Sequence, residues 1–182
     1  MALLLAISAN IGVSTMVSSF RLTFSAFLDQ RLAPELYVEV DDRPQSHKLA
    51  AYLKLNKIES LPLLSTIQEI DEEDVHVNGI YVGPTYRQNW KFLRASDNPW
   101  DRVQSGSAVI INEQLARRAN LWVGDTVTLS KIHVLPIAAI VGDYGNPNAE
   151  VIASASLIRS IEPHLYAVRF GIRTNVVEAL QN

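Results

Sequence analysis

The sequence of 182 residues contains no cysteine. This absence excludes disulfide bonds, cysteine nucleophiles and thiolate metal sites, but it does not fix the compartment, because many periplasmic proteins also lack cysteine. Motifs of catalysis and nucleotide binding are missing as well. The chain has no Gly-x-Ser-x-Gly nucleophile elbow and no glycine-rich phosphate loop ending in Gly-Lys-Ser/Thr. We therefore expect that the chain is not an enzyme and does not itself bind ATP.

The sequence also lacks the spacing of a metal site and the basic block of a nucleic-acid surface. The acidic run Asp71–Asp74 has neither the spaced ligands nor the central glycine of an EF-hand loop, so we interpret it as a solvated turn between strands. Lys and Arg number 16 against 19 Asp and Glu, and the formal net charge is -3. No catalytic, cofactor-binding or metal-binding residue is predicted, and no cofactor. The histidines are far apart in the sequence: His47, His76, His133 and His164.

Charge is absent from the first twenty residues, and Arg21 is the first charged side chain. A membrane helix needs about 20 mostly apolar residues, and this run has that length although it is rich in Ser and Asn. A signal peptide and a soluble core helix remain as alternatives, but no basic region precedes the apolar part as in a signal peptide. A periodic face of small or polar residues favours the membrane helix, because such faces pack against neighbouring helices in lipid. These residues are Ala2, Ala6, Asn10, Ser14 and Ser18.

The same helix is predicted to continue beyond the membrane as a stalk. It should end near Ala33, because Pro34 disfavours the helical conformation of the residue before it. At about 1.5 Å per residue, residues 2–33 would extend about 48 Å, whereas the hydrocarbon core is about 30 Å thick. An apolar stripe with helical spacing continues along the stalk: Phe20, Phe24, Phe27, Leu28 and Leu32.

A strand, a helix and a second strand follow within about 35 residues, which indicates a βαβ unit. The first strand is Leu36–Val40 and the second Ser65–Ile70. Between them, Ser46 could cap a helix that runs through about Lys57.

The residues from Val75 to Val82 alternate around Asn78-Gly79, which predicts a hairpin with a type I′ turn at that dipeptide. Tyr86–Gly106 has no clear periodicity, so we expect a long connection there. Its aromatic side chains should hold it against the body of the protein: Trp90, Phe92 and Trp100.

The second half of the chain is rich in short strands, with Pro136 tolerated only at an edge or a bulge. The loop Asp143–Asn148 has residues suited to turn geometry, and within it Tyr144 is a candidate contact residue. The expected strands are Ser107–Ile111, Thr126–Leu129, Val134–Val141, Glu150–Ser154 and Ala167–Arg173. The expected helices run from the cap residue Asn112 to about Ala119, over Ala155–Ile161, and onward from Asn175.

These patterns predict an α+β fold with a long N-terminal membrane and stalk helix, a βαβ-containing lobe and a strand-rich second lobe. The expected boundaries are 1–33 for the outer end of the membrane helix plus the stalk, 34–89 for the first βαβ lobe with its hairpin, 90–165 for the strand-rich lobe, and 166–182 for a truncated return to the first lobe.

Several stretches together resemble one family. They are Asn10–Arg21, Arg31–Val38, Asn112–Arg118 with Val123–Leu129, and Ile140–Pro147. The first is similar to the outer half of the first membrane helix of FtsX-like permeases of ABC transporters. The second is similar to the entry into their MacB-like periplasmic core domain, and the others to that domain's second lobe. No single motif is specific, so the resemblance depends on their order and spacing along nearly the whole chain.

The resemblance implies the extracytoplasmic domain of a permease subunit in the bacterial inner membrane, on the periplasmic side. The implied partners are a separate ATPase subunit, the other membrane helices of the permease, a dimer mate, and a periplasmic protein or lipophilic cargo, but no nucleic acid. ATP hydrolysis by the partner would move the membrane helices, and the stalk would carry that movement outward for export or mechanical signalling.

The chain departs from the family pattern, because it lacks a cytoplasmic start, a second membrane helix and most of the second βαβ half. We therefore expect it to be part of such a subunit. The alternative function is a membrane-anchored extracytoplasmic sensor domain that binds a ligand, which would need a pocket with convergent polar groups.

Overall fold

The computed structural model describes residues 2–31, 36–71, 73–143 and 145–173, and in the first helix the side chains of residues 7–25. The helices are α1 (Ala2–Arg31), α2 (Arg43–Leu55), α3 (Pro84–Asn89), α4 (Pro99–Gln104), α5 (Glu113–Arg118) and α6 (Ala155–Ile161). The strands are β1 (Leu36–Glu39), β2 (Glu59–Ile70), β3 (Glu73–Ile80), β4 (Phe92–Ala95), β5 (Val109–Asn112), β6 (Thr126–Leu129), β7 (His133–Val141), β8 (Ala149–Ser154) and β9 (Ala167–Arg173). They form a mixed sheet in the order β1-β9-β2-β3-β8-β5-β7-β4, with β6 paired to β7.

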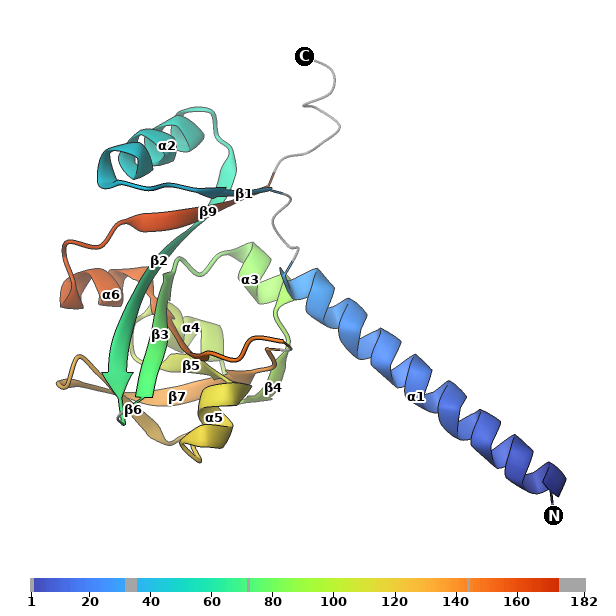
Figure 1. Cartoon of the computed structure of the whole chain (residues 1–182). Coiled ribbons are helices and arrows are strands. Elements are labelled where there is room, and N and C mark those ends of the chain that lie inside the picture. Colours follow the sequence, from blue (N-terminus) through green and yellow to red (C-terminus); the bar gives the residue numbers. More distant parts are fainter. Residues whose placement is uncertain (1, 32–35, 72, 144, 174–182) are drawn as a thin grey trace, which may run out of the picture.

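Helix α1 extends away from the body that contains the sheet (Figure 1). A helix is therefore present from Ala2 through Arg31, its expected end near Ala33 lies outside the described residues, and its role as a stalk stays a prediction. Phe20 and Phe24 stack with ring centroids 5.7 Å apart, as expected for positions four apart on one helical face. Within the described residues, no helix is both long enough and apolar enough to cross a membrane. The membrane helix thus stays a prediction.

The βαβ unit predicted after the stalk is present in a split form. Strands β1 and β2 each pair antiparallel with β9, so they run parallel to each other with β9 between them. The predicted cap of the intervening helix is wrong. Asp42 caps α2 by accepting a hydrogen bond from the Gln45 N–H at 2.7 Å. Ser46 lies inside the helix, buried, and its hydroxyl donates to the Ala167 carbonyl at 2.8 Å.

The hairpin predicted around Asn78-Gly79 is wrong as well, because β3 continues straight through both residues. The hairpin is formed by β2 and β3, with a turn that includes Asp71 at φ 51°. Packing, and not a turn, explains the glycine. A Cβ added at Gly79 would lie 3.1 Å from Ile158 of α6, so the absent side chain lets the helix approach the strand.

Residues 86–106 are not the predicted long connection. They contain most of α3, all of β4 and all of α4, and each of these two helices begins with a proline, which is favoured at the first helical position. The aromatic anchoring is confirmed. The rings of Tyr86, Trp90, Phe92 and Trp100 contact one another with centroids between 5.3 and 5.9 Å apart.

The strands predicted in the second half are present with small shifts at their ends, and α6 and β9 have the predicted bounds. Asn112 caps α5 as expected. Pro136 of β7 pairs with Thr126 of β6 on one side. On the other side, the pairing of β7 with β5 begins only at the next residue, Ile137, and shows a register shift directly after it. The predicted edge or bulge position is therefore confirmed. The helix expected from Asn175 lies outside the described residues.

Two apolar layers sandwich the centre of the sheet. Strand side chains alternate between them: Val109 and Ile111 belong to the layer that includes α5, α6 and β6, whereas Ile110 belongs to the layer beneath α3 and α4. A third cluster joins α2 to β9 through Leu53 and Phe170.

Candidate functional site

A groove of about 510 Å³ lies on one face of the strands β1, β9, β2, β3 and β8. Helices α2 and α6 pack against the opposite face of these strands, where Phe170 and Gly79 lie. Because strand side chains alternate, the neighbours Arg169 and Gly171 line the groove. The site is thus the uncovered side of the sheet whose other side forms part of the core.

One end of the groove is apolar. Leu61 and Leu63 of β2 lie two residues apart on the groove face and are half-buried. Ile80 at the end of β3 continues this surface, and Tyr86 of α3 and Trp90 directly after α3 close it. The short helix α3 therefore forms the end wall of the groove.

The position of α3 is fixed by a buried threonine. Thr85 is 1% exposed, and its hydroxyl donates to the Glu59 carboxylate at 3.0 Å. The Arg173 guanidinium lies 3.5 Å from the same hydroxyl, and Asn89 donates to the Thr85 carbonyl at 2.9 Å. These bonds connect the groove wall to the beginning of β2 and the end of β9.

Polar side chains occupy the rest of the floor. Arg169 and Glu39 are opposite each other on β9 and β1, and the guanidinium donates twice to one carboxylate oxygen, at 2.9 and 2.6 Å. Ser65 of β2 donates to the Asn78 side-chain oxygen of β3 at 2.9 Å. The groove therefore combines an apolar end with a paired, hydrogen-bonded floor.

Tyr86 of α3 lines the groove. Its side chain is 8% exposed. Burial, and to a smaller extent the nearby Tyr37, raises the pKa of Tyr86 well above its usual value. The hydroxyl consequently stays protonated at physiological pH and remains a hydrogen-bond donor.

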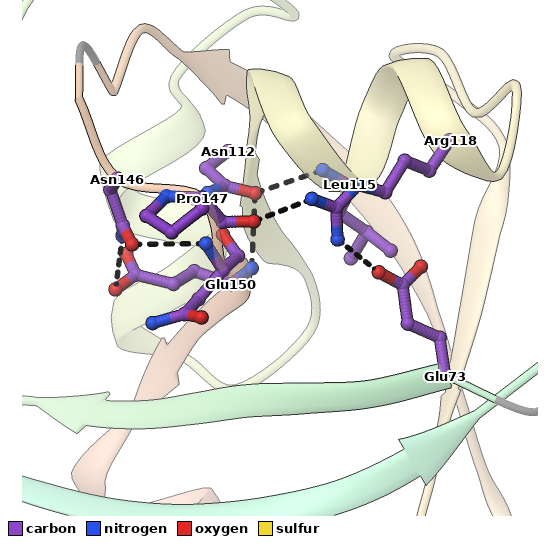
Figure 2. Close-up of polar contacts among 8 residues, drawn as sticks. Glu73, Asn112, Leu115, Arg118, Asn146, Pro147 and Glu150 are labelled. Carbon is purple, nitrogen blue, oxygen red and sulfur yellow. Dashed lines mark hydrogen bonds and ion pairs between the residues drawn. The ribbon is translucent and has the colours of Figure 1, made fainter.

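A second polar centre holds the loop between β7 and β8 (Figure 2). Asn112 is fully buried, and its side-chain oxygen accepts hydrogen bonds from the N–H groups of Leu115 and Glu150, each at 3.0 Å. Its amide nitrogen donates to the Asn148 carbonyl at 2.8 Å. One side chain therefore caps α5 and fixes the start of β8.

Arg118 at the end of α5 extends this network. Its guanidinium donates to the Pro147 carbonyl at 2.6 Å and to the Glu73 carboxylate of β3. Asn146 contacts the carboxylates of both Asp143 and Glu150. Residues 146–148 of the loop are thus bonded to Asn112, to α5 and to β8, and Arg118 links them to Glu73 of β3 (Figure 2).

The residues singled out from the sequence are scattered. His76 lies on the groove floor, whereas His47 is on α2, His133 begins β7, and His164 lies 3.7 Å from Glu162. No group of three or more potential metal ligands occurs within the described part of the chain. Asp71 forms the expected turn, but Glu73 and Asp74 belong to β3. Tyr144, the candidate contact residue, lies outside the described residues.

Sequence reasoning missed the groove. Its residues come from five strands and one helix that are adjacent only through the sheet order. The available local signal was the alternation of Leu61, Leu63 and Ser65 in a segment for which only the second half was predicted as a strand.

Comparison with known proteins identifies the fold. No family model and no curated protein matches the sequence. Among solved structures, the extracellular domain of YknZ, described as a noncanonic ABC-type transporter from Gram-positive bacteria, matches with a TM-score of 0.55 and 12% identity, covering 80% of this chain and 84% of that one. The periplasmic region of MacB from Actinobacillus actinomycetemcomitans matches with a TM-score of 0.54 and 16% identity, covering 80% and 78%. The chain has the fold of a MacB-like periplasmic domain.

A further match is a domain of a putative permease protein from Porphyromonas gingivalis, with a TM-score of 0.44 and 12% identity over 66% of this chain and 58% of that one. The matches to YknZ and MacB confirm the α+β fold and the resemblance to the MacB-like periplasmic domain at the level of the fold.

Proposed function

We propose that this chain is the extracytoplasmic domain of an ABC transporter permease subunit in the bacterial cell membrane. The observation that carries the proposal is the fold, which is shared over most of the chain with the extracellular domain of YknZ and the periplasmic region of MacB. The domain would couple ATP hydrolysis by a separate cytoplasmic partner to export or to mechanical signalling. It would make and break no covalent bond itself.

Helix α1 supports a role in the membrane and as a stalk. Every described side chain from Ile7 to Ser25 is exposed, including Met16 at 75% and Leu22 at 73%. Exposed apolar surface that continues along a whole helix requires a cover. In this proposal residues 1–33 are the outer end of a membrane helix plus the stalk, covered by lipid and by the other helices of the permease and its dimer mate.

The connection of the stalk to the sheet gives the proposal a mechanical route. Strand β1 is the first element after α1, and it pairs with β9 from Leu36 opposite Ile172 to Glu39 opposite Arg169. Strand β9 in turn pairs with β2. A displacement of α1 would therefore act first on strands β1, β9 and β2, which belong to the first lobe (residues 34–89 and 166–182). It would then reach the strand-rich lobe (residues 90–165).

A proline in the stalk tests this coupling. Ser25→Pro removes a hydrogen bond from the interior of α1 and should cost about 3 kcal/mol or more of helix stability. In the complete transporter we expect membrane insertion and ATP hydrolysis to persist while transport fails. Ser25→Ala, which keeps the helix, is the matched control. Normal transport by the proline variant would contradict the coupling role of α1.

The groove is the observation that favours a second candidate, a membrane-anchored sensor domain. Crosslinking distinguishes the two, and the absence of native cysteine means that an introduced cysteine is the only thiol in this chain. A permease predicts that Ser14→Cys crosslinks to other membrane helices, because small residues mark packed helix faces. Met16→Cys, two residues further along the helix and on another face, is the control and should crosslink less. If Ser14→Cys forms no crosslink and Ser14→Leu keeps full activity, the single-helix sensor is the better reading.

A further inference from the structure

The groove on the sheet has the properties of a small-molecule site. Its volume of about 510 Å³ lies within the range of about 300 to 1,000 Å³ that is usual for ligand pockets. Such pockets have mostly apolar walls and a few placed polar groups. Here Leu61, Leu63 and Trp90 supply half-buried apolar surface.

Tyr86 provides the observation that points to a ligand. The residue is more than nine-tenths buried and lines the groove, yet its hydroxyl forms no hydrogen bond with any residue that the structure describes. No buried side-chain nitrogen or oxygen in the described part of the chain lacks a hydrogen-bond partner, so the Tyr86 hydroxyl itself is reached by solvent in the groove. The high pKa of Tyr86 keeps its proton in place. The groove therefore presents a donor that has no acceptor among the described residues and that a ligand can reach.

Asn78 supplies a second donor on the floor of the groove. Its side-chain oxygen is occupied by the Ser65 hydroxyl, which orients the amide. The amide nitrogen of Asn78 makes no hydrogen bond within the described part of the chain. The ligand should therefore carry at least one hydrogen-bond acceptor.

The charges around the groove disfavour an anion. The Arg169 guanidinium is already paired with Glu39. Asp41 and Glu150 also line the groove, so carboxylates outnumber the one arginine in its lining. Because these carboxylates would repel a negatively charged ligand, the acceptor should be an uncharged carbonyl oxygen and not a carboxylate.

We propose that the groove binds an uncharged small molecule with an apolar body and a carbonyl oxygen. The apolar body lies on Leu61 and Leu63 against Trp90, and the carbonyl accepts a hydrogen bond from the Tyr86 hydroxyl. This proposal concerns the groove alone and does not depend on whether the chain belongs to a transporter or to a sensor.

Two uncharged dyes test the proposal on the full chain. Nile red is apolar and carries a carbonyl group, whereas N-phenyl-1-naphthylamine is apolar without one. We expect both to bind, and Tyr86→Phe to weaken Nile red about three- to tenfold, as for the loss of one hydrogen bond, while leaving N-phenyl-1-naphthylamine unchanged. Tyr81→Phe, at an exposed tyrosine outside the groove, is the matched control.

A blocking substitution separates the groove from the apolar surface of α1, which could also take up dye. Leu63→Trp should fill the groove and abolish the saturable binding of both dyes, whereas Leu93→Trp on the exposed part of β4 should not. Circular dichroism checks folding, and Leu61→Trp replaces Leu63→Trp if that variant is unfolded.

Three results would overturn the proposal. The first is equal binding of Nile red to the wild type and to a folded groove-filling variant. The second is an equal effect of Tyr86→Phe on both dyes. The third is a wild-type dimer, seen by sedimentation, that a groove-filling variant converts to a monomer, because the occupant would then be a second copy of the chain.

Discussion

Replacing Asn112 with alanine should destabilise the protein more than removing any other helix cap of the body. The side chain is fully buried and makes three hydrogen bonds, to the N–H groups of Leu115 and Glu150 and to the Asn148 carbonyl. Loss of an N-cap alone costs about 1 kcal/mol. Leaving a buried donor or acceptor without its partner costs about 1–3 kcal/mol for each group. The sum of the cap and two newly unpaired groups is about 3 kcal/mol or more.

Urea unfolding followed by far-ultraviolet circular dichroism measures this free energy directly, and thermal unfolding gives an independent estimate. For a chain of this size, 1 kcal/mol shifts the melting temperature by about 2–4 °C, so Asn112→Ala should lower it by about 6–12 °C. The slope of the urea transition should stay unchanged, because the surface newly exposed on unfolding should be the same in the variant and in the wild type.

Two other caps provide matched controls. Asp42 caps α2 at an exposed position, and Asp42→Ala should cost only about 1 kcal/mol. Ser154 caps α6 through one bond from the Leu157 N–H at 3.2 Å, and Ser154→Ala should give an intermediate loss. The reasoning is refuted if Asn112→Ala and Asp42→Ala have the same free energy of unfolding.

Two further predictions concern Gly79 of β3 and Tyr86 of α3. Gly79→Ala should destabilise the protein by about 1 kcal/mol, because overpacking against Ile158 costs about 1–3 kcal/mol, whereas replacing a strand glycine by alanine stabilises by only about 0.5–1 kcal/mol. In an Ile158→Ala background, urea unfolding should show a smaller loss of free energy for the same substitution. An equal loss in both backgrounds would contradict the packing argument. The raised pKa of Tyr86 means that above about pH 10 the unfolded chain loses this proton and the folded chain keeps it, so the free energy of unfolding should fall with rising pH, by up to about 1.4 kcal/mol per pH unit for this group. Between pH 8 and 11, the free energy of unfolding should fall less steeply with pH for Tyr86→Phe than for the wild type, whereas Tyr81→Phe should follow the wild type. Parallel curves for Tyr86→Phe and the wild type would contradict the raised pKa of Tyr86.

The elements that the sequence predicts well are those specified by local chemistry. Asn112 precedes a helix pattern and caps α5, and alternation alone gives β9 its bounds of Ala167–Arg173. The long helix α1 follows from an uninterrupted run without proline before Pro34. In each case the neighbours in the chain are the groups that stabilise the element, so a reading of consecutive residues is sufficient.

The wrong predictions have long-range causes. Asn78-Gly79 has the residues of a tight turn, but Ile158, almost eighty positions later, needs the space above Gly79. Ser46 has the chemistry of a helix cap, but Ala167 accepts its hydrogen bond across the βαβ unit. A polar or glycine residue can thus serve a distant segment, and the local pattern does not reveal which use the fold makes of it.

The groove shows why a candidate site could not be predicted at all. Strand β9 presents Phe170 to α2 and Arg169 to the groove, so consecutive residues lie in the core on one face and in the groove on the other. The same division runs through β3, where Val77 is in the core while His76 and Asn78 face the groove. Substitutions at alternate positions of one strand should therefore have separable effects. Those on the covered face should lower stability, and those on the groove face should change binding while the fold persists.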